Sequence, residues 1–136
     1  KLYFKMINYL SKYKFIFYLA NICLVVLYLF PGSILGFFIY GDIQTQPQIT
    51  SDFIVSTNHV YAFFLLSIIG SFTFKKSKNL NFLILYLIFL SIILEMSHLI
   101  IPERGFELTD IFGNLVGVIM AIIVNYFYKK YENYKD

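Results

Sequence analysis

The sequence predicts an all-α, polytopic membrane protein, a four-transmembrane-helix bundle with both termini cytoplasmic. Of its 136 residues, 59% are hydrophobic and only 14% are charged, whereas soluble domains carry about 25% charged residues. The apolar residues fall in runs of membrane-spanning length. The basic residues lie mostly at the ends of these runs. The length suits a single domain over residues 1–136.

The first predicted transmembrane helix covers about residues 13–30 and stops before Pro31 and Gly32, because proline and glycine favour the end of a helix. A basic juxtamembrane segment precedes it, with Lys1, Lys5, Lys12 and Lys14. A basic start and an apolar core are also typical of a signal peptide. The apolar core is long for a signal peptide and no Ala-x-Ala site follows it, so we expect a retained helix.

Residues 31–54 are predicted to form an outward loop. Within it, residues 33–40 are apolar but too short to span a bilayer, so we expect this patch at the membrane interface or over the bundle. Three further transmembrane helices are predicted at about residues 55–74, 80–101 and 109–128, the second of them closed by Pro102.

The distribution of lysines predicts the orientation. Ten of the eleven basic residues lie in the N-terminal segment, in the turn at 75–78 and in the C-terminal tail, and the other loops hold only Arg104. The positive-inside rule then places both termini in the cytoplasm, so we expect a multi-pass membrane protein. A net charge of +3 that gathers at helix ends predicts no nucleic-acid partner. Cys23 is the only cysteine, so no intrachain disulfide forms.

Polar residues in apolar helices are expensive and usually functional. His59 lies 16 residues before Lys75, Glu95 lies 16 after Asn79, and Asn114 lies 15 before Lys129. At 1.5 Å per residue, all three side chains are expected about 22–24 Å from the inner boundary, roughly one turn below the outer surface. Three helices therefore place a polar group at one depth, which predicts a shared outward-opening site.

Helical spacing predicts which faces turn inward. In the second predicted helix the inward face consists of His59, Phe63, Leu66 and Gly70. In the third it consists of Ser91, Glu95 and His98, with Leu94 turned elsewhere. In the fourth it consists of Asp110, Asn114, Gly117 and Ala121. Gly113 and Gly117 form a small-xxx-small pair, which is typical of close helix packing in membranes.

Several roles stay open for these side chains. The catalytic candidates are Glu95, His59, His98 and Asp110, as acid–base groups or residues that orient them. Arg104 and Asn114 are the ligand-binding candidates, since a guanidinium suits a carboxylate or phosphate. Four of them also have a structural alternative: Asn114 as interhelical glue, Asp110 as a helix-dipole partner, and the two histidines as packing groups. Glu95 is harder to explain in this way, because a carboxylate inside the membrane needs a partner or a proton. Arg104 is expected either to neutralise Glu95 or Asp110 or to bind a ligand. A weaker alternative is a metal site of Glu95, His98 and His59, because Glu95-x-x-His98 has the spacing found in di-metal bundles.

Two patterns in the chain resemble the VanZ-like family, named for a protein associated with teicoplanin resistance. The resemblance covers about residues 55–125 and rests on His59, Ala62, Phe63, Glu95, His98, Pro102, Arg104, Asp110, Asn114 and Gly117. The chain departs from the family at Val55-Ser56, where Asp-Lys is usual, and at His98, where Gln is more common.

The resemblance implies a role in the cell envelope, with reduced susceptibility to lipoglycopeptides as the named example, and it implies no particular reaction. It also implies a multi-pass protein of the bacterial inner (cytoplasmic) membrane. We expect an outward-facing polar pocket that engages an anionic, lipid-linked or cell-wall-related group. The alternative is a non-enzymatic accessory or scaffold subunit of a larger membrane complex. The expected partners are membrane lipids, a lipid-linked envelope precursor or other membrane subunits, and no cofactor is expected.

Overall fold

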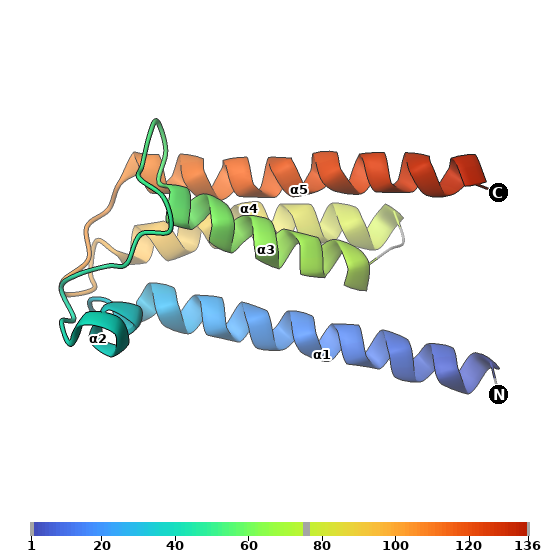
Figure 1. The fold of residues 1–136 in the computed structure, drawn as a ribbon, viewed down its shortest axis with the longest axis horizontal. Coiled ribbons are helices and arrows are strands. Elements are labelled where there is room, and N and C mark those ends of the chain that lie inside the picture. The colour runs from blue at the N-terminus through green and yellow to red at the C-terminus, as the bar shows by residue number, and fades with distance from the viewer. Residues whose placement is uncertain (1, 75–76, 136) are drawn as a thin grey trace.

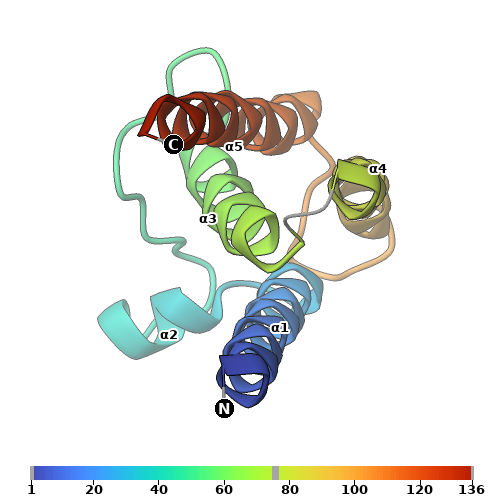
Figure 2. The same ribbon diagram turned by 90° about the vertical axis from the view of Figure 1, so that its right-hand side faces the viewer.

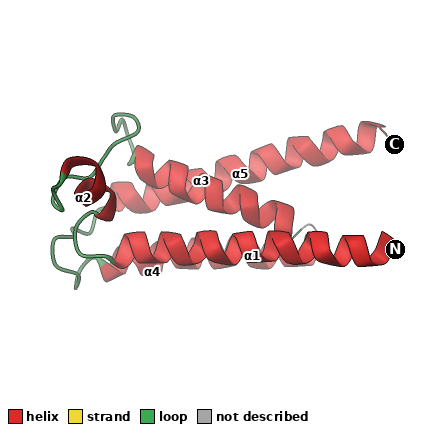
Figure 3. Cartoon of the chain, turned by 60° about the horizontal axis from the view of Figure 1, so that its bottom comes forward, coloured by secondary structure: helices red, strands yellow, loops and turns green. Residues whose placement is uncertain are grey.

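The chain folds as a bundle of helices, with no strand among the residues that the structure describes (Figure 3). The structure, a computed structural model, describes residues 2–74 and 77–135, and the side chains of 14–74, 79–131, 133 and 134. Its helices are α1 (Leu2–Leu29), α2 (Ile34–Tyr40), α3 (Thr57–Thr73), α4 (Ser77–Ser97) and α5 (Leu108–Lys135).

Helix α3 occupies the centre of the bundle, between α1, α4 and α5 (Figure 2). Its most extensive packing is against α5. The start of α1 and the end of α5 lie at one end of the bundle, while α2 and the loops at 41–56 and 98–107 lie at the other (Figure 1). The fold therefore separates a terminal end from a loop end.

Helix α1 begins earlier than predicted, because residues 2–13 continue the same helix rather than forming a separate segment. No glycine or proline occurs before Pro31, so nothing local interrupts it. After Pro31, Gly32 has a φ of 82° and the chain turns by 82° into α2. The Ser33 side chain caps α2 by accepting a hydrogen bond from the Gly36 N–H at 2.9 Å, and Gly41, with a φ of 70°, closes it.

The other boundaries also differ from the predicted ones. Helix α4 ends at Ser97 instead of 101, and residues 98–101 form turns, with the His98 N–H donating to the Glu95 carbonyl at 3.1 Å. Pro102 disfavours a helical conformation at Ile101, so the helix cannot continue past this turn. Helix α5 continues to Lys135, seven residues beyond the predicted end at 128, because its charged tail contains no helix-breaking residue.

The membrane character of the helices is supported in part. Among the described residues, Asn79–Ser97 of α4 and Leu108–Tyr131 of α5 are long and apolar enough to cross a membrane, and α1 with α2 gives a third span if the bent pair counts as one. Helix α3 has 17 residues, about 26 Å, which is shorter than a hydrocarbon core of about 30 Å. Two or three spans are therefore evident, where the sequence predicts four.

The surface of the bundle is rich in large apolar side chains. Phe82, Leu85, Phe89 and Ile93 of α4 are each more than half exposed, a pattern that suits contact with lipid rather than water. Of the positions behind the predicted orientation, Lys1, Lys75 and Lys76 lie outside the described residues, and Lys5, Lys12, Lys78 and Lys135 lie outside the described side chains.

Burial confirms most of the predicted inward faces. His59, Phe63, Leu66 and Gly70 of α3 are all buried, and so are Ser91, Glu95, His98, Asn114, Gly117 and Ala121. One prediction is wrong: Leu94, expected to turn elsewhere, is 3% exposed. Leu94 belongs to the apolar core with Phe63 and Leu66. The buried face of α4 is wide enough to include both Leu94 and its neighbour Glu95.

Candidate functional site

A buried polar cluster lies at the loop end of the bundle and draws on four helices. It consists of Tyr28 from α1, His59 from α3, Glu95 from α4 with His98 just after it, and Asp110 and Asn114 from α5. Glu95 and Asn114 are 0% exposed, and His98 is 3% exposed. Because an unpaired buried polar group costs free energy, the hydrogen bonds of this cluster decide what it can do.

Tyr28 joins α1 to α3 and α5. Its hydroxyl donates to the Asn114 Oδ1 atom at 2.8 Å and lies 3.0 Å from the His59 Nδ1 atom. His59 Nδ1 is also 3.2 Å from Asn114 Oδ1. The Tyr28 hydroxyl has a single proton, and it is donated to Asn114 Oδ1. The hydrogen bond between Tyr28 and His59 therefore needs a proton on His59 Nδ1. The other ring nitrogen of His59, Nε2, then has a free lone pair.

The Glu95 carboxylate is held on one side only. Its Oε1 atom lies 3.2 Å from the His98 Nδ1 atom and accepts the Glu107 N–H at 3.0 Å. His98 Nε2 lies 3.0 Å from the Tyr28 carbonyl oxygen, which can only accept, so Nε2 carries a proton. The Glu95 Oε2 atom is buried and has no hydrogen-bond partner among the described residues.

Asp110 approaches the cluster from the first turn of α5. Its Oδ2 atom lies 3.4 Å from His59 Nε2, an arrangement in which a proton or a cation can be shared. One ligand atom each from His59, Glu95 and Asp110 lies within 4.8 Å of the other two. His98 is not part of this group, because both of its ring nitrogens face other partners.

Arg104 anchors the loop that connects α4 to α5. Its Nε donates to the Phe30 carbonyl at 3.2 Å, one Nη to the Leu27 carbonyl at 2.7 Å, and the other to the Gln46 side chain at 3.2 Å. A cation at the last carbonyls of α1 also suits the helix dipole. Burial lowers the pKa of the Arg104 guanidinium, although arginine remains protonated in proteins. Arg104 therefore pairs with neither Glu95 nor Asp110 directly.

A cavity of about 390 Å³ lies beside the polar cluster. Its polar lining includes Tyr28, His59, Asn58, Gln46 and Arg104. Its apolar lining comes from α1, α2, α3 and the loop before α3, and consists of Leu27, Leu35, Ile39, Pro47, Ile49, Ala62 and Leu65, with Tyr61. The cavity is therefore apolar along most of its wall, with a cation and hydrogen-bonding groups also in contact with it.

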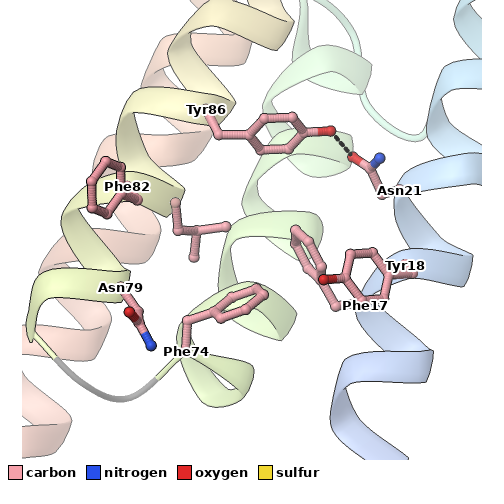
Figure 4. A pocket seen from close by; sticks show the side chains of 8 residues that line it. Phe17, Tyr18, Asn21, Phe74, Asn79, Phe82 and Tyr86 are labelled. Atoms are coloured by element: carbon pink, nitrogen blue, oxygen red, sulfur yellow. Dashed lines mark hydrogen bonds between the residues drawn. The ribbon is translucent and has the colours of Figure 1, made fainter.

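A second cavity, of about 440 Å³, lies between α1, α4 and the end of α3 (Figure 4). It is lined mainly by aromatic side chains, and Tyr86 closes one side by donating a 2.8 Å hydrogen bond to Asn21 (Figure 4). Among the described residues that line it there is no acidic or basic side chain. This cavity lies toward the terminal end of the bundle, away from the polar cluster.

Two glycines allow α5 to approach α3 at the site. A Cβ atom at Gly113 would lie 2.6 Å from the Ser56 carbonyl and 3.1 Å from the His59 Cβ. A Cβ atom at Gly117 would lie 2.8 Å from the Phe64 nitrogen. Only glycine permits this approach, which brings Asp110 and Asn114 to His59.

The structure brings together His59, Glu95, His98, Asp110 and Asn114, and it places Arg104 at the edge of the cluster. Sequence reasoning missed Tyr28, the residue that connects three helices. Its one signal was position: Tyr28 lies three residues before Pro31, at the end of its apolar run that corresponds to the level of the other polar groups. Among 12 tyrosines, that signal was not distinctive.

Comparison of the chain with protein-family models, with curated proteins and with solved structures finds no match.

Proposed function

We propose that this chain is a VanZ-like integral membrane protein of the bacterial cell envelope. Its outward-facing pocket binds an anionic, lipid-linked group and thereby alters susceptibility to lipoglycopeptide antibiotics. The observation that carries the proposal is the cavity beside the polar cluster, in which the cationic Arg104 shares a wall with apolar side chains of α1, α2 and α3.

The proposed topology has four spans, α1, α3, α4 and α5, with α2 at the outer interface and both termini in the cytoplasm. It is supported by the position of the two chain ends at one end of the bundle, opposite the polar cluster (Figure 1). The lysine-rich ends and turn follow the positive-inside rule. The short α3 fits because its neighbours cover it on several sides, and membranes adapt to a shorter helix at a modest cost.

The chemistry of the cavity favours an amphiphile with a negative headgroup. Arg104 uses three of its five N–H groups on Leu27, Phe30 and Gln46 within the described chain, which fixes the guanidinium and leaves two donors for a ligand. No carboxylate lies among the described lining residues of the cavity, so an anion meets no like charge at the wall. The apolar side chains from α2 and α3 offer a path for a hydrocarbon chain.

The family resemblance supports the same proposal. His59, Glu95, Asp110 and Asn114 correspond to the family pattern, and all four lie in the polar cluster. The departures at Val55-Ser56 and His98 leave the family's chemistry out of the proposal.

Binding is tested with the purified full chain in detergent, by calorimetry with farnesyl phosphate as the probe. Farnesol and inorganic phosphate are the controls for the tail and the headgroup. We expect farnesyl phosphate to bind most tightly, and Arg104→Ala to weaken it by about tenfold or more, since a hydrogen bond to a charged group contributes about 1.5–3 kcal/mol. Ala62→Leu fills the cavity and is expected to abolish binding of both farnesyl compounds.

A matched control for Arg104→Ala is Lys129→Ala, which removes a cation at the terminal end of the bundle. Equal affinity of the wild type and Arg104→Ala for farnesyl phosphate, with both variants folded by circular dichroism, would overturn the anion site. In a lipoglycopeptide-sensitive bacterial host, expression of the wild type should raise the inhibitory concentration of teicoplanin, and Arg104→Ala and Glu95→Gln should reduce that effect. Unchanged protection by both inserted variants counts against the envelope role.

The second candidate is a non-enzymatic subunit of a larger membrane complex, favoured by the mainly aromatic cavity between α1 and α4 (Figure 4). Purification in mild detergent separates the two. A stoichiometric protein partner, lost on Phe82→Ala and retained on Arg104→Ala, supports the subunit.

A further inference from the structure

Three side chains of the polar cluster are arranged as ligands for a cation. One ligand atom each of His59, Glu95 and Asp110 lies within 4.8 Å of the other two, and they come from three different helices. Zn²⁺ binds such atoms at about 2.0–2.2 Å, so neighbouring ligand atoms around it lie about 3.4 Å apart. The 3.4 Å between His59 Nε2 and Asp110 Oδ2 already has this value. The Glu95 oxygen lies within 4.8 Å of both atoms, so a small side-chain movement completes the set.

His59 presents the correct nitrogen. Its Nδ1 atom faces the Tyr28 hydroxyl at 3.0 Å and Asn114 Oδ1 at 3.2 Å, and with the tyrosine proton directed to Asn114 it must donate. Nε2 is left unprotonated and points toward Asp110. Metal-binding histidines are held in this way, with the second ring nitrogen donating to a fixed acceptor.

Glu95 supplies an independent observation. Its side chain is 0% exposed, and its Oε2 atom has no partner among the described residues, whereas Oε1 is held by His98 and Glu107. Buried carboxylate oxygens are normally satisfied, so an orphan of this kind calls for a ligand. The nearby basic side chains are engaged elsewhere, His98 on the Oε1 side of Glu95 and Arg104 on the carbonyls of α1.

We propose that His59, Glu95 and Asp110 bind one divalent transition-metal ion of the Zn²⁺ class. One imidazole nitrogen and two carboxylate oxygens make a donor set that suits Zn²⁺ and Mn²⁺ rather than soft, thiolate-bound metals. Three protein ligands leave a coordination position open, as in catalytic rather than structural zinc sites. Tyr28 and Asn114 position His59, and His98 positions Glu95. This site goes beyond the lipid-binding proposal and does not depend on it.

The ligand set differs from the one that spacing predicts. The Glu95-x-x-His98 motif suggests His98 as a ligand, but in the structure both His98 nitrogens are occupied, by Glu95 Oε1 and the Tyr28 carbonyl. Asp110 takes its place, because α5 packs closely on α3 through Gly113 and Gly117.

The test uses the untagged full chain in detergent, stripped with a chelator and free of lipid phosphate. Zn²⁺ and Mn²⁺ titrations by calorimetry should show one equivalent bound, and Co²⁺ should give d–d absorption bands. Asp110→Asn and Glu95→Gln keep the side-chain shape but lose the charge. Each should weaken binding by at least the 10–100-fold that loss of an outer partner causes. Asp42→Asn, in the exposed loop before α3, is the matched control and should bind like the wild type.

A titration of the wild type alone can overturn the site. If the folded protein binds none of Zn²⁺, Mn²⁺ and Co²⁺ stoichiometrically, there is no metal site, and His59 and Asp110 are a proton-sharing pair. Unchanged affinity in Asp110→Asn also overturns it. If that variant does not fold, Co²⁺-shifted resonances of labelled His59 in the wild type decide, since a metal bound elsewhere leaves them unshifted. If no metal binds but farnesyl phosphate still does, the metal-site proposal is refuted and the anion-site proposal stands.

Discussion

Replacement of Gly117 by alanine tests whether the contact between α3 and α5 holds the site together. A Cβ atom at this position would lie 2.8 Å from the Phe64 nitrogen and closer still to the Val60 carbonyl oxygen. The first distance is about 0.7 Å short of the ~3.5 Å at which non-bonded heavy atoms attract one another. Both neighbours are backbone atoms of α3, so no side chain can rotate away and the helices must separate.

The size of the effect follows from two opposing terms. Overpacking that shifts the backbone costs about 1–3 kcal/mol, and a rigid backbone contact favours the upper part of that range. Alanine in a helix gains about 1 kcal/mol over glycine. We expect Gly117→Ala to lower the free energy of unfolding by about 1–2 kcal/mol. In a membrane this contact is all the more important, because helices there associate by close packing.

The assay is reversible unfolding of the full chain in mixed micelles, titrated with denaturing detergent and followed by circular dichroism. The control is Gly105→Ala in the loop before α5, where a Cβ atom would meet nothing within 4 Å and φ is not positive. The free energy of unfolding of Gly105→Ala should lie within about 0.5 kcal/mol of the wild-type value, as for most surface substitutions. Equal stability of Gly117→Ala and Gly105→Ala would refute the close contact, and with it the approach of Asp110 and Asn114 to His59.

Three other variants test separate parts of the structure. Tyr28→Phe leaves buried partners unsatisfied and should lower the free energy of unfolding by about 1–3 kcal/mol in the same assay. Tyr86→Phe removes a hydrogen bond that is exposed and should lower it clearly less. Equal losses in the two variants would contradict a buried network. Ser33→Ala removes the N-cap of α2 and should cost about 1 kcal/mol, with faster amide exchange confined to α2; protection unchanged there would rule out the cap. The hydrogen bond from Thr45 holds the pKa of Asp42 below its ordinary value, so this carboxylate stabilises the fold above its unfolded pKa and loses that contribution as pH falls through the folded pKa. Thr45→Val should raise the Asp42 pKa measured by NMR, and no change would show that the bond is absent in solution.

The sequence is sufficient for the helical class and for the level at which His59, Glu95 and Asn114 meet. Hydrophobic runs and breaker residues predicted helices at 55–74, 80–101 and 109–128, and the structure has α3, α4 and α5 there. Depth counting placed His59, Glu95 and Asn114 at one level. These predictions succeed because helical rise and period are local properties, fixed by the backbone rather than by distant contacts.

The particular pairs of side chains that meet between helices were beyond the sequence. The role of Tyr28, the engagement of Arg104 with the carbonyls of α1, and the exchange of His98 for Asp110 beside His59 all depend on how the helices pack. In the part of the chain that it describes, the structure shows two or three spans rather than four, because α3 is short and α1 and α2 form a bent pair. Apolar composition indicates that a helix can enter a membrane. The packing of the bundle decides how that helix is rotated about its axis and which helices are its neighbours. The glycines of α5 fix that packing against α3, and the orphan oxygen of Glu95 appears only once the helices are in place.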